Sequence, residues 1–201
     1  MNPTTGCINS KPPRRLAFTV TELLLVTAAV TLLLITAGAA IQRGWRESRR
    51  TTCANNLKQI TQGCLMFAAQ YGRLPAAARL RQPKPEDWIH WQLDRELKES
   101  AIAQFCSDWR WERLRCPLDA QWSDRSYMAS YTMNGFVERA MPFDMGPHGK
   151  ILLAEQERPN DGCWGPALGE EPLTERHQGQ AHVAFGDGHI QSIQPYKKME
   201  R

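Results

Sequence analysis

An apolar run from Phe18 to Ile41 constrains this chain more than any other feature. Its 24 residues would form a helix of about 36 Å, long enough to cross a hydrocarbon core of about 30 Å. A cleaved secretory peptide has an apolar region of only about 7–15 residues, so we expect the mature chain to keep this span. Glu22 is the single charged residue within the run. A charge inside a span costs roughly 2.5–3.5 kcal/mol on insertion scales. It therefore indicates either a functional partner or a carboxylate that reaches the membrane interface.

The net charge argues against a nucleic-acid partner. It is +4 over 201 residues, and it falls to +1 when Lys11, Arg14 and Arg15, which precede the span, are set aside. A nucleic-acid-binding domain normally carries a basic face, which so small a charge does not suggest. Basic residues also follow the span, so the positive-inside rule does not orient the chain by itself.

The helix is expected to continue beyond the membrane. No proline occurs between Phe18 and Leu74, and Gly72 and Pro75 mark its expected end. Apolar residues then recur at alternating spacings of four and three, which predicts an amphipathic helix over residues 43–74. They are Cys53, Leu57, Ile60, Cys64, Phe67 and Tyr71. A coiled coil is the alternative interpretation of this stripe.

Residues 75–201 are expected to form a globular domain. Pro85 and the acids after it predict a second helix that ends near Glu99, and the many tryptophans of this region are expected to pack a small core. Strands are predicted over 126–133, before a turn at Asn134-Gly135, and over 151–154, 181–185 and 189–193. A two-residue turn at Asp187-Gly188 would place Phe185 opposite Ile190. We therefore predict an α+β fold in which the helix packs on a small antiparallel sheet.

The order of basic leader, Ala17-Phe18-Thr19-Val20-Thr21-Glu22 and long apolar helix resembles the N-terminus of type IV prepilins and type II secretion pseudopilins. In that family a membrane-embedded peptidase cuts before the Phe on the cytoplasmic side and methylates the new amine. The resemblance implies cleavage between Ala17 and Phe18, although Gly is usual where this chain has Ala17. It also implies that the Phe18 amine of a neighbouring subunit neutralises Glu22.

Further segments resemble a large bacterial group of pseudopilin-like proteins. They are CANNLKQITQG, LRCPLDA, SYTMNGF, ILLAE and RHQGQAHVAFGDGH. That group is recognised by a C-terminal His, nine residues and then Asp-Gly, a spacing that His177, Asp187 and Gly188 match. The resemblance covers nearly the whole chain from Arg14 onward.

Five cysteines remain after the leader, which contains Cys7. They are Cys53, Cys64, Cys106, Cys116 and Cys163. Because Cys53 and Cys116 lie in two of the family-like segments, we expect them to form a disulfide if the domain meets oxidising conditions. Buried thiols that act as small apolar residues are the alternative. No CxxC pair is present, which gives a structural zinc site little support.

The C-terminal histidines suggest metal ligands at first sight. However, the proposed hairpin puts His182 and His189 on different strands, roughly 10 Å or more apart along the hairpin axis, and Asp187 has an adequate role in a turn. No nucleophile–base motif and no phosphate-binding loop occurs in the sequence. We therefore expect no metal, no cofactor and no enzymatic activity.

Together these features predict a structural subunit of a type IV pilus-like or type II secretion pseudopilus filament. Its expected parts are a cleaved leader (1–17), a transmembrane helix (18–42), an amphipathic continuation (43–74) and a periplasmic domain (75–201). It would sit in the bacterial inner membrane as a single-pass protein, with the leader cytoplasmic. The expected partners are the prepilin peptidase, membrane lipid and other pilin or pseudopilin subunits. The alternative is a membrane-tethered periplasmic binding module that joins no filament.

The processing hypothesis predicts a mature chain that begins at Phe18, with an N-methylated amine. Intact-mass analysis of the protein from cells with an active prepilin peptidase measures this directly. A chain that retains residues 1–17 in such cells would contradict it.

Overall fold

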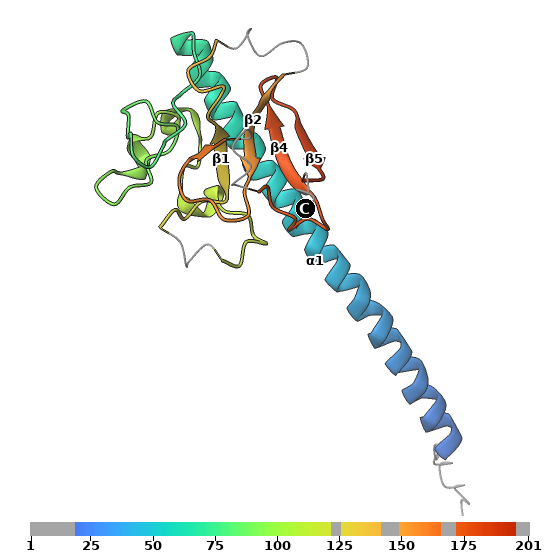
Figure 1. Cartoon of the computed structure of the whole chain (residues 1–201). Coiled ribbons are helices and arrows are strands. Elements are labelled where there is room, and N and C mark those ends of the chain that lie inside the picture. Colours follow the sequence, from blue (N-terminus) through green and yellow to red (C-terminus); the bar gives the residue numbers. More distant parts are fainter. Residues whose placement is uncertain (1–18, 122–125, 142–148, 166–171, 196–201) are drawn as a thin grey trace, which may run out of the picture. The chain divides into compact units, whose positions relative to one another are not determined.

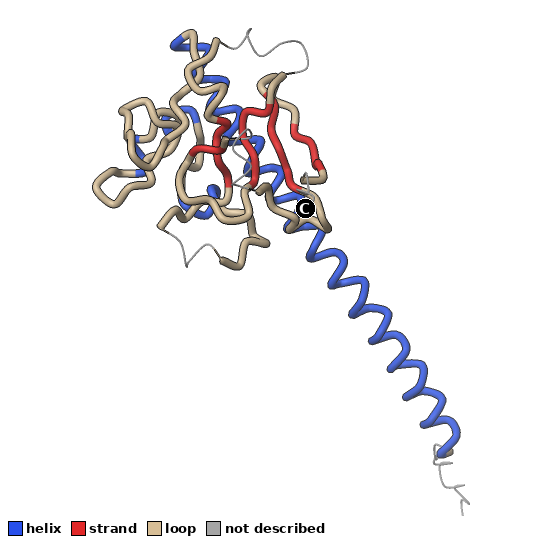
Figure 2. The backbone as a smooth tube through the Cα atoms, in the orientation of Figure 1, coloured by secondary structure: helices blue, strands red, loops and turns tan. Residues whose placement is uncertain are grey.

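The computed structural model describes residues 19–121, 126–141, 149–165 and 172–195, and it divides the chain into two compact units, Met1–Gly44 and Trp45–Arg201. Figures 1 and 2 show the helix, the strands and the long loops between them. In chain order the elements are α1 (Val20–Tyr71), the 3₁₀ turns η1 (Leu97–Glu99), η2 (Ala103–Phe105) and η3 (Trp111–Leu114), and the strands β1 (Tyr131–Asn134), β2 (Ile151–Glu155), β3 (Cys163–Trp164), β4 (Ala181–Phe185) and β5 (Ile190–Ile193).

Helix α1 spans 52 residues, as the absence of proline predicted. It ends at Tyr71, where Gly72 adopts a φ of 72° and its N–H donates to the carbonyl of Ala68 at 2.9 Å. A positive φ at this position suits glycine, which lacks the Cβ that would clash. The predicted end of the helix is therefore confirmed.

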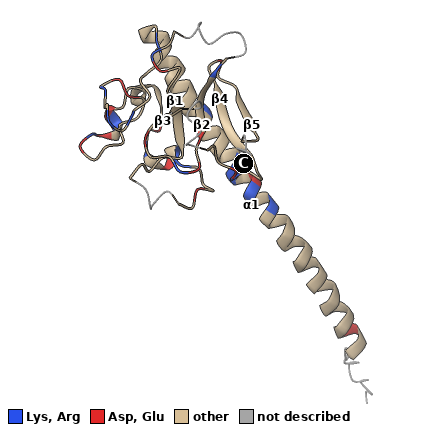
Figure 3. Cartoon of the chain, viewed as in Figure 1, with Lys and Arg blue, Asp and Glu red and all other residues tan. Residues whose placement is uncertain are grey.

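The first unit contains the apolar part of α1, and its side chains have no protein cover within that unit. Leu25 and Ile35, for example, are 72% and 70% exposed. Charged residues are absent from Leu23 to Gln42, and Figure 3 shows this stretch without red or blue. By length and composition, α1 is the one helix among the described residues that is able to cross a membrane.

In the second unit the remainder of α1 buries the predicted stripe. Cys53, Leu57, Ile60, Cys64 and Phe67 are all buried. The last stripe member is Tyr71, which is 49% exposed, although its ring lies 4.5 Å from that of Phe67. The amphipathic interpretation is thus confirmed, and the stripe is covered by the rest of the same chain.

The sheet has the strand order β3-β1-β2-β4-β5, and it lies beside α1 within the second unit (Figure 1). The α+β fold is confirmed. The β1–β2, β2–β4 and β4–β5 pairs are antiparallel, as predicted, whereas β3 pairs with β1 in parallel, which makes the sheet mixed. β3 is only two residues long, so no strand pattern marks it in the sequence.

Alternation along the strands divides the sheet into two faces. On β2, Leu153 packs in the main core with α1, whereas Ala154 belongs to a small cluster with Val183 and Trp164. Ala184 belongs to the main core, one residue after Val183. Because side chains alternate with a period of two, Glu155 and His182 must lie on the same face as Leu153 and Ala184, toward α1.

The β4–β5 hairpin is present, but the predicted two-residue turn is wrong. Ala184 pairs with Ile190, so Phe185 lies opposite His189, and their rings stack at 4.2 Å. The loop has three residues, 186–188, and Gly188 has a φ of 91°. A three-residue loop with glycine in the left-handed region is a common hairpin connection, which an Asp-Gly pair alone does not distinguish.

The predicted helix from Pro85 to Glu99 is also wrong; only η1 is helical there. Backbone N–H groups of this segment bond outside it instead: the Trp88 N–H donates to the Ala76 carbonyl at 2.9 Å. The Asp87 carboxylate accepts from the Lys84 N–H at 2.8 Å and from Arg95 at 2.7 Å. These contacts satisfy the backbone in a turn rather than a helix.

The described tryptophans of the segment 88–111 pack the core, as expected, and Trp122 lies outside the described residues. Trp88 and Trp91 are buried, and each indole N–H donates to a carbonyl, of Gly162 at 2.9 Å and of Ala78 at 3.1 Å respectively. Trp109 and Trp111 pack against the same core. Buried indole N–H groups require such acceptors, so these rings are fixed in orientation as well as in position.

Replacing Leu57 with Ala should lower the free energy of unfolding by about 2–5 kcal/mol, because this side chain of α1 is fully buried in the main core. Lys58→Ala is the matched control, since Lys58 is exposed on the same helix, and it should change stability by less than about 0.5 kcal/mol. Denaturant unfolding of the detergent-solubilised full chain measures both. Equal effects would contradict the assignment of the buried face.

Candidate functional site

The predicted site residues that the structure describes lie at the start of α1, in a buried cluster of the second unit and in the β4–β5 loop. Ala17 and Phe18 lie outside the described residues. Glu22 lies in the first turn of α1, and its carboxylate accepts hydrogen bonds from the N–H and hydroxyl of Thr19 at 2.9 and 2.8 Å. The Glu22 N–H in turn donates to the Thr19 hydroxyl at 3.2 Å. This is a capping box, in which Thr and Glu three residues apart satisfy the free N–H groups at a helix start.

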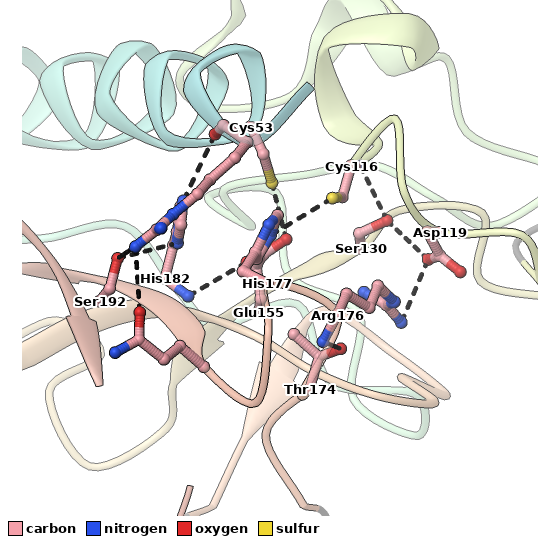
Figure 4. A network of polar contacts seen from close by, with 12 residues as sticks. Cys53, Cys116, Asp119, Ser130, Glu155, Thr174, Arg176, His177, His182 and Ser192 are labelled. Carbon is pink, nitrogen blue, oxygen red and sulfur yellow. Dashed lines mark hydrogen bonds and ion pairs between the residues drawn. The ribbon is translucent and has the colours of Figure 1, made fainter. Parts of the chain in front are cut away.

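The second place is a buried cluster in the second unit, formed by Cys53, Cys116, Glu155 and His177. One potential ligand atom of each lies within 4.8 Å of the other three. Figure 4 shows the side chains converging from α1, the loop after η3, the end of β2 and the segment before β4. All four residues are at most 1% exposed. We call these four residues the Glu155 cluster.

Local structure explains how each side chain reaches the cluster. Glu155 and Tyr131 are paired across β2 and β1 and face α1, beside Cys53. Two residues with positive φ follow His177, Gln178 at 59° and Gly179 at 82°, and they turn the chain sharply into β4.

Cys116 is fixed through its backbone. Its N–H donates to the Ser130 hydroxyl at 3.0 Å, and that hydroxyl donates to Asp119 at 2.7 Å. Asp119 also pairs with Arg176 at 3.4 Å, and Arg176 donates to the carbonyl of Glu157 at 2.7 Å. A buried chain of polar contacts therefore joins the loop of Cys116 to the segment that precedes His177 (Figure 4).

Two short contacts inside the Glu155 cluster involve the Glu155 carboxylate, and a longer one joins His177 to Cys116. His177 Nε2 lies 2.9 Å from Glu155 Oε2 and 3.6 Å from the Sγ of Cys116. The Cys53 thiol donates to Glu155 Oε1 at 2.7 Å and lies 3.1 Å from the Tyr131 hydroxyl. The Nδ1 atom of His177 is buried and has no partner within the described part of the chain.

These contacts lower the pKa of Glu155 and raise the pKa of His177. Burial raises the pKa of Glu155, but the hydrogen bond and charge of His177 and the Cys53 thiol lower it to about 2. Burial lowers the pKa of His177, but its contacts with Cys116 and Glu155 raise it to about 9. Without a metal, the pair is therefore a carboxylate and an imidazolium.

The two thiols differ from each other. Burial, with the nearby Cys116 and Glu155, raises the pKa of Cys53 well above its usual range, so that Cys53 remains a thiol. The hydrogen bond with Cys53 lowers the pKa of Cys116 against the effect of burial, and the contact with His177 acts in the same direction. A Cys–His–Glu arrangement resembles that of a nucleophile and its base. At no more than 1% exposure, however, none of these groups can touch a substrate in this conformation.

The structure brings together some of the residues that the sequence singled out. Cys53 and Cys116 are neighbours and both are free thiols, so their disulfide stays a prediction. His177 belongs to the same cluster. Asp187 and Gly188 do not: they form the hairpin loop, where Asp187 contacts the exposed His189 at 2.5 Å.

Sequence reasoning missed Glu155 and the role of His182. The signal for Glu155 was an acid that ends the apolar run ILLAE and remains on its buried face. His182 stacks on His177 with ring centroids 4.1 Å apart, and the backbone N–H of His182 donates to Glu155 Oε2 at 3.1 Å. Its ring nitrogens lie 3.4 Å from the Arg50 carbonyl and from the Ser192 hydroxyl.

Comparison with known proteins gives one family match. Residues 43–139, just under half of the chain, match a family model described as "Protein of unknown function (DUF1559)". The matched region contains Cys53 and Cys116 but ends before Glu155 and His177. No curated protein and no solved structure matches the chain.

Replacing His177 with Ala should cost about 3–5 kcal/mol of stability, because it leaves the fully buried Glu155 carboxylate without its cation. His189→Ala is the control: its side chain is 47% exposed, and the loss should stay within about 0.5 kcal/mol. Denaturant unfolding of both variants in the same detergent measures the difference. A His177→Ala protein as stable as His189→Ala would contradict the proposed importance of this ion pair.

Proposed function

We propose that this protein is a structural subunit of a type IV pilus-like or type II secretion pseudopilus filament, assembled after a prepilin peptidase removes residues 1–17. One observation carries the proposal: the apolar part of α1 exposes its side chains within its own unit and contains a single acid. Such a surface requires lipid or other apolar helices around it. A subunit that moves from a membrane to a filament would use both environments in turn.

The polar groups of this segment support the proposal because nearly all have partners within the helix. The hydroxyls of Thr27, Thr31 and Thr36 donate to carbonyls three or four residues earlier, at 2.9–3.1 Å. These threonines therefore need nothing from a neighbour in lipid. Glu22 is different, because the structure pairs it with no cation among the described residues.

The capping box gives Glu22 a role within its own helix, which differs from the proposed pairing with a neighbouring subunit. Capping requires only an oxygen acceptor, whereas neutralisation by the Phe18 amine of an adjoining subunit requires a negative charge. Glutamine keeps the acceptor and loses the charge. The two roles therefore predict different results for Glu22→Gln, and Glu22→Ala removes both.

The test is assembly of the full chain in its native host. Glu22→Gln should be cleaved and stably inserted like the wild type, but it should assemble at least about tenfold less, as an unpaired buried charge in the neighbour would cost well over about 1.4 kcal/mol. A photo-crosslinker at Leu25, which is 72% exposed, should capture copies of this chain or other pilin-like helices. A crosslinker at the exposed Leu93 of the second unit is the control for random encounter.

One outcome would contradict the role proposed for Glu22, and another would contradict the filament subunit itself. Normal assembly of Glu22→Gln would leave Glu22 with its capping role alone. Crosslinks at Leu25 that reach only lipid, in cells that produce the filament, would favour a membrane-tethered module that joins no filament.

A further inference from the structure

We propose that the Glu155 cluster binds one Zn²⁺ ion as a closed structural site. Cys53, Cys116, Glu155 and His177 supply the four ligands. This inference goes beyond the filament proposal and does not depend on it, because all four residues lie in the second unit.

The geometry carries the proposal. In tetrahedral zinc sites with Zn–S of about 2.3 Å and Zn–N or Zn–O of about 2.0–2.2 Å, neighbouring ligand atoms lie roughly 3.3–3.8 Å apart. The 3.6 Å between Cys116 Sγ and His177 Nε2 falls in that range. Glu155 contacts His177 through Oε2 at 2.9 Å and Cys53 through Oε1 at 2.7 Å, and one ligand atom of each residue lies within 4.8 Å of the others. Tetrahedral coordination by one carboxylate oxygen therefore requires shifts of about 1 Å. Side-chain rotation is sufficient for such a change.

The donor set selects the metal class. Two thiols, one imidazole and one carboxylate suit zinc, whereas Ca²⁺ and Mg²⁺ prefer six or more oxygen ligands. Four protein ligands leave no position open for substrate, which indicates a structural rather than a catalytic ion. On binding, zinc takes the place of the thiol protons of Cys53 and Cys116 and of the Nε2 proton of His177, which are released to solvent.

A second shell of hydrogen bonds holds the ligands in position. Glu155 Oε2 accepts from the His182 N–H at 3.1 Å, the Tyr131 hydroxyl lies 3.1 Å from Cys53 Sγ, and Ser130 fixes the Cys116 backbone. Such outer partners orient metal ligands and are worth about 10–100-fold in metal affinity. Because these contacts already exist between protein groups, the site is preorganised.

The absence of a CxxC motif does not oppose the site. CxxC places two ligands on one short loop, whereas here each ligand comes from a separate segment of the chain between Cys53 and His177, and Cys53 and Glu155 are 102 residues apart. The ion would therefore join α1, the loop after η3, β2 and the segment before β4. Its role would be to fix the C-terminal hairpin to the helix.

The predicted Cys53–Cys116 disulfide is the rival, because it would consume both sulfur ligands. A second rival is a metal-free Glu155–His177 ion pair beside two thiols. Glu155 and His177 are dispensable for a disulfide but are direct ligands of zinc. Variants of these two residues therefore distinguish the three states.

The experiment uses the full chain in detergent, purified with reductant and without chelator. Elemental analysis should find one Zn²⁺ per chain, and removal by a chelator should lower Tm, which added Zn²⁺ should restore. Glu155→Gln and His177→Gln should each bind Zn²⁺ at least about tenfold more weakly. Cys64→Ser is the matched control: its thiol is buried on the same helix and lies outside the cluster, so zinc should remain.

If the ligand variants fail to fold, Co²⁺ bound to the wild-type chain tests the same point. Tetrahedral coordination should give visible d–d bands, and the two thiolates should add near-ultraviolet charge-transfer absorption. A reduced, folded wild-type chain that binds neither Zn²⁺ nor Co²⁺ would overturn the proposal. So would ligand variants with wild-type affinity, or a Cys53–Cys116 disulfide in protein isolated from its host without reductant.

Discussion

The second unit depends on the neutralisation of one buried carboxylate. Glu155 is fully buried, and an isolated carboxylate there would cost far more than the domain's net stability. Its charge is balanced by His177 at 2.9 Å, and its remaining acceptor positions are filled by the Cys53 thiol and the His182 N–H. The packing of α1, β2 and the C-terminal segment is therefore coupled, because Cys53 of α1 and His177 of the C-terminal segment both contact Glu155 of β2.

Glu155 and Glu22 are stabilised in opposite ways. Glu155 is held by groups far away in sequence, inside a complete core. Glu22 is held by Thr19, three residues away, and leaves its charge unpaired among the described residues. A buried acid that the domain satisfies internally supports the fold, whereas an acid satisfied only by a cap at an exposed apolar helix remains available to a partner.

The sequence predicted features that depend on local spacing. The end of α1 follows from Gly72, the buried stripe from Cys53 to Phe67 follows from the spacing of four and three, and the strands predicted over 151–154 and 181–185 follow from short apolar runs. It did not predict features set by tertiary contacts. The segment after Pro85 has acids suited to a helix start, but Asp87 binds Lys84 and Arg95 instead. Glu155 became visible only when the fold placed it beside Cys53 and His177, because no short spacing links the three.

The wide separation of the cluster's members along the chain has a consequence for biogenesis. Cys53 lies 102 residues from Glu155, and Cys116 lies 61 residues from His177. Nearly the entire polypeptide must therefore leave the ribosome before the core can close, and contacts of such high sequence separation form slowly. A nascent chain of this kind stays open while its apolar segment is already available to any partner, lipid or protein. The apolar segment of α1 is therefore complete early in synthesis, and closure of the second unit comes last.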